Sequence, residues 1–98
     1  MLYRISVTQQ DIDNGTRCCE KSCPHTIAIR RVIGYEKLVN VDISKVVFSR
    51  FDDGKRVSAE VDLDSTVSAW INAYDKGRHV SPIEYNLSIP DEFIQSAV

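Results

Sequence analysis

Hydrophobic and polar residues alternate along two segments, one near each end of the chain. The apolar positions are Tyr3, Ile5 and Val7 in the first segment and Ile83, Tyr85, Leu87 and Ile89 in the second, with polar residues between them. Successive side chains of a strand point to opposite faces, so this period predicts strands over residues 2–7 and 83–89, each with one buried face. Pro90 ends the second strand.

Apolar residues recur at helical spacing in two other segments, which predicts amphipathic helices over residues 24–33 and 65–76. The recurring residues are Ala28, Ile29, Val32 and Ile33 in the first helix and Val67, Trp70, Ile71 and Tyr74 in the second. Capping residues mark the helix ends. Ser22 or Cys23 with Pro24 begins the helix over 24–33 and Gly34 ends it, while Asp64 and Gly77 flank the helix over 65–76. Thr8 with Asp11, and then Gly15, indicate one or two further helical turns over 9–14.

The central segment predicts a β-hairpin. Residues 38–51 are rich in Val, Ile and Phe and lead to Asp53-Gly54, a strong turn signal. With these two as the turn residues, the facing pairs are Asp52 with Lys55, Phe48 with Ala59 and Val46 with Val61. If the same alternation is continued back along the chain, Val41 and Ile43 fall on the opposite face from Val46 and Phe48, so we expect a bulge or break near Ser44.

The order strand, helix, strand, strand, helix, strand predicts a two-layer α+β domain. Because every strand alternates, we expect one antiparallel or mixed sheet of about four strands with two helices on one face. A ferredoxin-like arrangement is the simplest one that keeps the crossovers right-handed. With 98 residues the chain is a single domain over 1–98, and the tail over 91–98 either packs back through its apolar residues or frays.

Charge and hydropathy exclude several classes of protein. The chain has 12 Lys and Arg against 14 Asp and Glu, a net charge of −2, so no global field favours nucleic acid or an anionic membrane. No apolar run approaches the ~20 residues of a membrane span, and the first residues lack the layout of a signal peptide. We therefore expect a soluble cytoplasmic protein that does not bind membranes.

The chain has 3 cysteines, all between residues 18 and 23. An odd number within one short segment does not indicate an extracellular disulfide framework. Cys19, Cys23 and His25 are an alternative metal-ligand set, with Cys18 or the distant His79 in addition. Structural zinc normally uses two well-spaced ligand pairs, and the second pair is missing. We therefore expect no metal and no cofactor, with Cys23 a small buried apolar residue.

The sequence does not predict an enzyme. It contains no Gly-rich phosphate loop, nucleophile elbow or His-Glu-x-x-His helix. The paired acids Asp52-Asp53 and Asp62-Leu63-Asp64 fall where turns and helix caps use aspartate.

The hairpin register leaves a small apolar patch on the outer face of the predicted sheet. Val47, Phe51 and the stem of Arg56 lie on this face, and we expect them to bind a protein partner. The alternative is a nucleic-acid-binding accessory protein, in which an exposed aromatic and nearby arginines bind single strands. Phe51 is the aromatic candidate there, with Arg4, Arg50, Arg56 and Arg78 as the basic ones.

Two sequence segments resemble small proteins of bacteriophages and prophages to which no activity is assigned. The first is Ile5 to Gly15 (ISVTQQDIDNG) followed by Cys23 to Ile29 (CPHTIAI), which matches a Val-Thr strand end, an Asp-Ile turn with Gly and a Cys-Pro-led helix. The second is Ala73 to Tyr85 (AYDKGRHVSPIEY), a helix end, glycine and returning strand. The resemblance implies a phage origin, a location in the host cytoplasm and no particular functional residue.

Small phage proteins without catalytic motifs often inhibit or redirect host proteins. We therefore predict an accessory protein that binds a host or phage protein stoichiometrically, for example as an inhibitor of a host defence or regulatory enzyme. This prediction rests on the class of protein and not on a motif.

Overall fold

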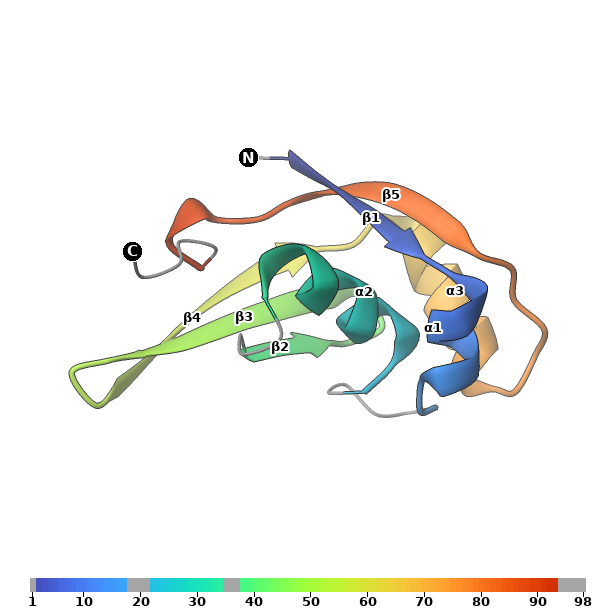
Figure 1. The fold of residues 1–98 in the computed structure, drawn as a ribbon, viewed down its shortest axis with the longest axis horizontal. Helices are drawn as coiled ribbons and strands as arrows, with labels where there is room; N and C mark the ends of the chain where they lie inside the picture. Colours follow the sequence, from blue (N-terminus) through green and yellow to red (C-terminus); the bar gives the residue numbers. More distant parts are fainter. Residues whose placement is uncertain (1, 18–21, 35–37, 94–98) are drawn as a thin grey trace.

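The computed structural model describes residues 2–17, 22–34 and 38–93 (Figure 1). In chain order the elements are β1 (Leu2–Val7), α1 (Gln9–Asn14), α2 (Pro24–Ile33), β2 (Leu38–Val41), β3 (Lys45–Asp52), β4 (Lys55–Asp62), α3 (Ser65–Asp75), β5 (Ile83–Ser88) and a 3-10 helix, η1 (Asp91–Phe93). The α+β class is confirmed, and the predicted strands over 2–7 and 83–89 and helices over 9–14, 24–33 and 65–76 are present within one residue of their expected ends, while the segment 38–51 forms two strands, β2 and β3.

The strands form two antiparallel sheets and not the single sheet of about four strands expected from the alternation. β1 pairs with β5, and β2, β3 and β4 form a second sheet in that order. A ferredoxin-like sheet also requires β1 to pair with β4, and the described residues contain no such ladder. In keeping with an edge position for β4, its inward residues Val57, Ala59 and Val61 are only partly buried.

Helix α2 contacts both sheets, through β1 on one side and β2 on the other. It therefore packs against both sheets, whereas the sequence predicted a helix lying across a single sheet (Figure 1). The shared core takes residues from β1, α2, β2, β3, α3, β5 and η1 and from the positions just before α2 and just after β5: Ile5, Val7, Cys23, Ala28, Ile29, Ile33, Val39, Val41, Val46, Phe48, Val67, Ile71, Tyr85, Leu87, Ile89 and Phe93.

The β3–β4 hairpin has the register predicted from its turn. Asp52 faces Lys55, Phe48 faces Ala59 and Val46 faces Val61. Asp53 and Gly54 both have positive φ, at 51° and 79°, as a tight two-residue hairpin turn requires. The expected break near Ser44 is also present, because β2 ends at Val41 and a tight turn returns the chain as β3.

The helix caps explain how the N-terminal half is held together. Thr8 and Asp11 form a reciprocal capping box at the start of α1. Gly15 follows α1 as predicted but for a different reason, since its φ of −74° suits any residue. A side chain there would place its Cβ 2.6 Å from the ring of Pro24, so glycine permits the close approach of the loop to α2.

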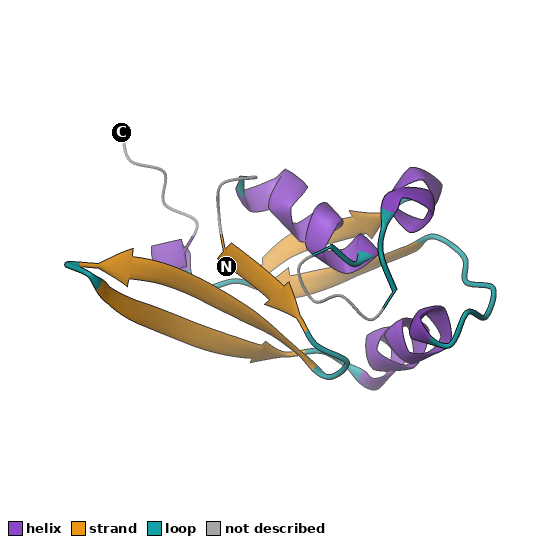
Figure 2. Ribbon diagram, turned by 90° about the horizontal axis from the view of Figure 1, so that it is seen from below, coloured by secondary structure: helices purple, strands orange, loops and turns teal. Residues whose placement is uncertain are grey.

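The molecule is elongated, with extents of 42 × 23 × 22 Å. The tip of the β3–β4 hairpin lies at one end, and α1 and α3 lie at the other (Figures 1 and 2). Phe93 of η1 packs back on Phe48, with ring centroids 6.2 Å apart. The remaining tail residues, 94–98, lie outside the described residues. Among the helices described, none is both long and apolar enough to cross a membrane.

Candidate functional site

The three residues predicted to bind a partner lie on one face of the β3–β4 hairpin. Phe51 is directly opposite Arg56, and Val47 is opposite Glu60, so all three side chains project from the same side of the sheet. Phe51 is 66% exposed, which is high for a phenylalanine on a paired strand. We call this side of the three-stranded sheet the outer face. Its role in binding stays a prediction.

Neighbouring elements extend this face in a way the sequence reasoning missed. Leu38 of β2 lies opposite Ser49 and is 43% exposed. Together with side chains of α2 and the hairpin it borders a hollow of about 420 Å³, lined by Arg30, Leu38, Val39, Asn40, Phe51 and Arg56. We call this the outer-face hollow. Alternation within 38–41 would have found Leu38 once β2 was paired with β3, but nothing local in the sequence brings Arg30 to the hairpin.

Hydrogen bonds hold Arg56 across the outer face. Its Nε and Nη2 atoms donate to the Ser49 hydroxyl at 3.3 and 3.0 Å. Ser49 is buried beneath the guanidinium and also shares a hydrogen bond of 3.1 Å with Ser58. The arginine is therefore positioned by neutral partners, and its charge is not neutralised by them.

Arg30 projects from the last turn of α2 into the same hollow. Its Nε is buried and has no hydrogen-bond partner in the described part of the chain. An unpaired buried donor costs free energy that a bound acceptor would recover. The outer-face hollow thus combines apolar walls with two guanidinium groups.

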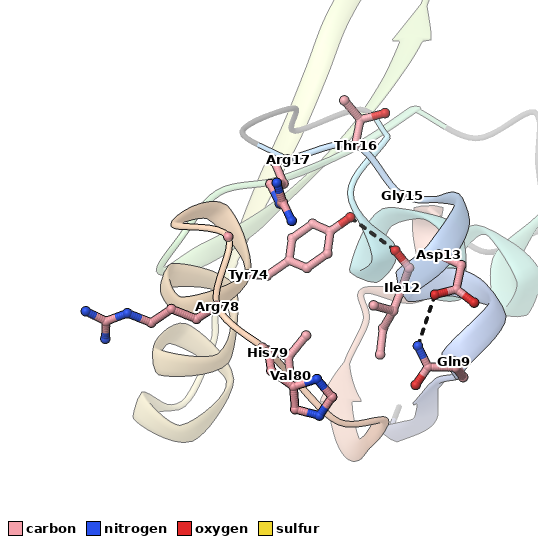
Figure 3. A pocket seen from close by; sticks show the side chains of 11 residues that line it. Gln9, Ile12, Asp13, Gly15, Thr16, Arg17, Tyr74, Arg78, His79 and Val80 are labelled. Carbon is pink, nitrogen blue, oxygen red and sulfur yellow. Dashed lines mark hydrogen bonds between the residues drawn. The ribbon is translucent and has the colours of Figure 1, made fainter.

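A second hollow of about 740 Å³ lies between α1 and the segment after α3 (Figure 3). In Figure 3 the Tyr74 ring occupies its centre, and its hydroxyl donates to the Ile12 carbonyl at 3.2 Å. Burial raises the pKa of Tyr74 although the charge of Arg17 opposes the shift. Asp13 on the opposite wall accepts a hydrogen bond from Gln9. These two pairs of polar groups satisfy each other, while Arg17 and His79 also line the hollow.

The alternative metal site gains no support from the geometry. Cys19 and Cys18 lie outside the described residues, while His79 lines the second hollow and is exposed. The Cys23 thiol shares a hydrogen bond of 3.3 Å with the Thr26 hydroxyl, and burial raises its pKa. No group of three potential ligands occurs within residues 2–17, 22–34 and 38–93.

His25 is a core residue at the start of α2. It is 0% exposed, and its Nδ1 lies 2.8 Å from the Tyr85 hydroxyl. The Trp70 ring packs against it edge to face, with centroids 4.5 Å apart. Burial lowers the pKa of His25 to about 4 and raises that of Tyr85, so both are neutral near pH 7. This environment suits a structural histidine, and the buried ring is not accessible to a substrate.

Comparison with known proteins adds no relative: no family model, no curated protein and no solved structure matches the chain.

Proposed function

We propose that this protein acts by binding another protein stoichiometrically through its outer face. The observation that carries the proposal is the exposure of Phe51 and Leu38 beside Arg56 on a sheet whose other face is packed into the core. Exposed apolar side chains next to arginine are typical of the centre of protein interfaces. The hairpin also projects from the body, so a partner can approach it with little steric hindrance (Figure 2).

The mechanism would be occlusion: the bound protein loses access to the surface that the hairpin covers. The resemblance to phage proteins supports a host or phage protein as the partner. In its most specific form, the proposal is an inhibitor of a host defence or regulatory enzyme. No catalytic step by this chain is needed for that outcome.

Nucleic-acid binding remains the second candidate, and one observation favours it. Phe51 lines the same hollow as Arg30 and Arg56, and an aromatic ring near guanidinium groups can stack a base. Among the described residues, however, Phe51 is the one exposed aromatic of the outer face, and Leu38, which is also exposed there, is aliphatic. Aliphatic side chains contribute little to base stacking, so a protein partner fits the face better.

The test is a quantitative capture experiment with tagged protein and host lysate, with and without nuclease. We expect one stoichiometric protein that persists after nuclease and is lost with Phe51→Glu. Leu2→Glu is the matched control, because Leu2 is 67% exposed but lies on β1, outside the outer face. Capture that survives Phe51→Glu would overturn the surface assignment. Capture that requires nucleic acid would favour the second candidate.

A further inference from the structure

Two arginines, Arg30 and Arg56, line the outer-face hollow, and neither has an acidic partner within residues 2–17, 22–34 and 38–93. The ion pairs among the described residues join Arg4 to Glu84, Arg31 to Asp11 and Lys45 to Glu60. Arg30 and Arg56 belong to none of them. The outer face therefore carries local positive charge on a protein whose net charge is −2.

Glu60 and Asp52, the acidic residues of the hairpin nearest to Arg56, form no ion pair with it. Glu60 lies on the outer face, but its carboxylate is held by Lys45 at 3.0 Å. Asp52 follows Phe51 in an alternating strand, so it projects to the opposite face. The two guanidinium groups are thus left to an external anion.

The chemistry of the hollow selects among anions. Guanidinium groups match the planar geometry of a carboxylate and form charge-assisted hydrogen bonds with it. Leu38 and Phe51 supply apolar walls in the same hollow, and Asn40 adds an amide. A ligand that fills the site must therefore present an anionic group, a carboxylate or a phosphate, close to an apolar side chain.

We propose that the outer-face hollow binds an acidic–apolar segment of a partner protein, in which an Asp or Glu side chain lies between Arg30 and Arg56 and a neighbouring apolar side chain packs on Phe51 and Leu38. This inference rests on the proposed function and deepens it by naming the chemistry of the partner segment. Single-stranded nucleic acid offers phosphates to the same arginines but no aliphatic group for Leu38, which makes it the outcome to be excluded.

The experiment selects displayed random peptides of about 12 residues, long enough in extended form to cross the sheet. Each peptide is fused at both ends, so that its only carboxylates are side chains. The full-length protein is the bait, and selected peptides are then measured by fluorescence polarisation. We expect enrichment of Asp or Glu next to Leu, Phe or Trp, with binding that weakens as salt is raised. A labelled oligothymidine serves as the nucleic-acid probe and should bind more weakly than the peptides.

Three variants make the result specific. Arg56→Gln and Arg30→Gln should each weaken the selected peptides by about tenfold or more, since each removes charge-assisted hydrogen bonds. Arg78→Gln is the matched control, because this exposed arginine borders the second hollow and lies outside the outer face (Figure 3). Thermal melting of every variant confirms that it is folded.

The outcomes separate this inference from the proposed function. Peptides that need Phe51 but show no acidic preference, or that bind Arg56→Gln and Arg30→Gln normally, would overturn the inference and leave the outer face as the binding surface. Peptides that bind Phe51→Glu normally would overturn both. Tighter binding of the oligothymidine than of any peptide would replace the peptide ligand with nucleic acid.

Discussion

Asp11 connects three elements of the fold, and replacing it with asparagine should destabilise the protein. Its carboxylate accepts hydrogen bonds from Arg31 of α2 at 2.9 and 2.6 Å and from the Thr8 backbone N–H at 3.0 Å. Arg31 in turn donates to the Ser6 carbonyl of β1 at 2.9 Å. The side chain of Asp11 is almost fully buried, so water cannot replace the lost partners there. Asp11→Asn removes the charge and places an N–H₂ group against existing donors.

The magnitude follows from the exposure of the two partners. Removing one member of a buried ion pair costs about 3–5 kcal/mol, and a hydrogen bond to a charged group contributes about 1.5–3 kcal/mol. Because the Arg31 side chain is 41% exposed and can be rehydrated, Asp11→Asn should lower the free energy of unfolding by about 2 kcal/mol. For a domain of this size, that loss lowers Tm by about 8–16 °C.

The assay is thermal and denaturant unfolding followed by Trp70 fluorescence, the chain having 1 tryptophan. Asp13→Asn is the matched control, since Asp13 is an exposed residue of the same helix whose carboxylate accepts a hydrogen bond from the exposed Gln9; it should change stability by less than about 0.5 kcal/mol. A double-mutant cycle with Arg31→Gln should show coupling of about 1 kcal/mol or more. An Asp11→Asn protein that melts like the wild type, or additive single variants, would refute the reasoning.

Changes of pH and of single residues should also alter the stability of the protein. Burial raises the pKa of Asp11, but hydrogen bonds from Arg31 and Thr8 and the charge of Arg31 lower it more, so this pKa lies below its ordinary value of 3.8. The stability that the ionised carboxylate contributes should therefore persist above that pH and fall at lower pH. Burial lowers the pKa of His25 from 6.5 to about 4, so unfolding free energy should fall by about 3 kcal/mol as pH drops through that interval; His25→Gln should abolish this slope and His79→Gln preserve it. Trp70→Ala should cost about 2 kcal/mol in denaturant titrations, less than for a fully buried tryptophan, because its ring is only partly buried. Gly15→Ala should lower Tm through a clash with the α2 N-terminus, and an unchanged Tm would contradict the close approach.

The local structure could be predicted from the sequence because its signals are short-range. Each of these signals acts within a few residues of chain. Helix caps are formed by Thr8 with Asp11 and by Asp64, and the hairpin turn is formed by Asp53-Gly54. The hairpin register follows from the turn alone, and so does the common face of Val47, Phe51 and Arg56.

The division into two sheets could not be predicted from the same signals. Alternation tells which face of a strand is buried but not which strand edges meet, and the contacts of α2 with one strand of each sheet join residues far apart in the chain. The contribution of Arg30 to the outer-face hollow depends on the same long-range packing. The burial of His25 against Trp70 and Tyr85 also joins residues far apart in sequence, whereas proximity along the chain suggested a ligand set with Cys23.

Hydrogen–deuterium exchange of the protein alone and with its captured partner tests the central claim most directly. The account predicts partner-induced protection concentrated in β2 and the β3–β4 hairpin, the elements that form the outer face. Protection confined to α1 and the segment after α3, which line the second hollow, would contradict it and move the binding surface to the opposite end of the molecule.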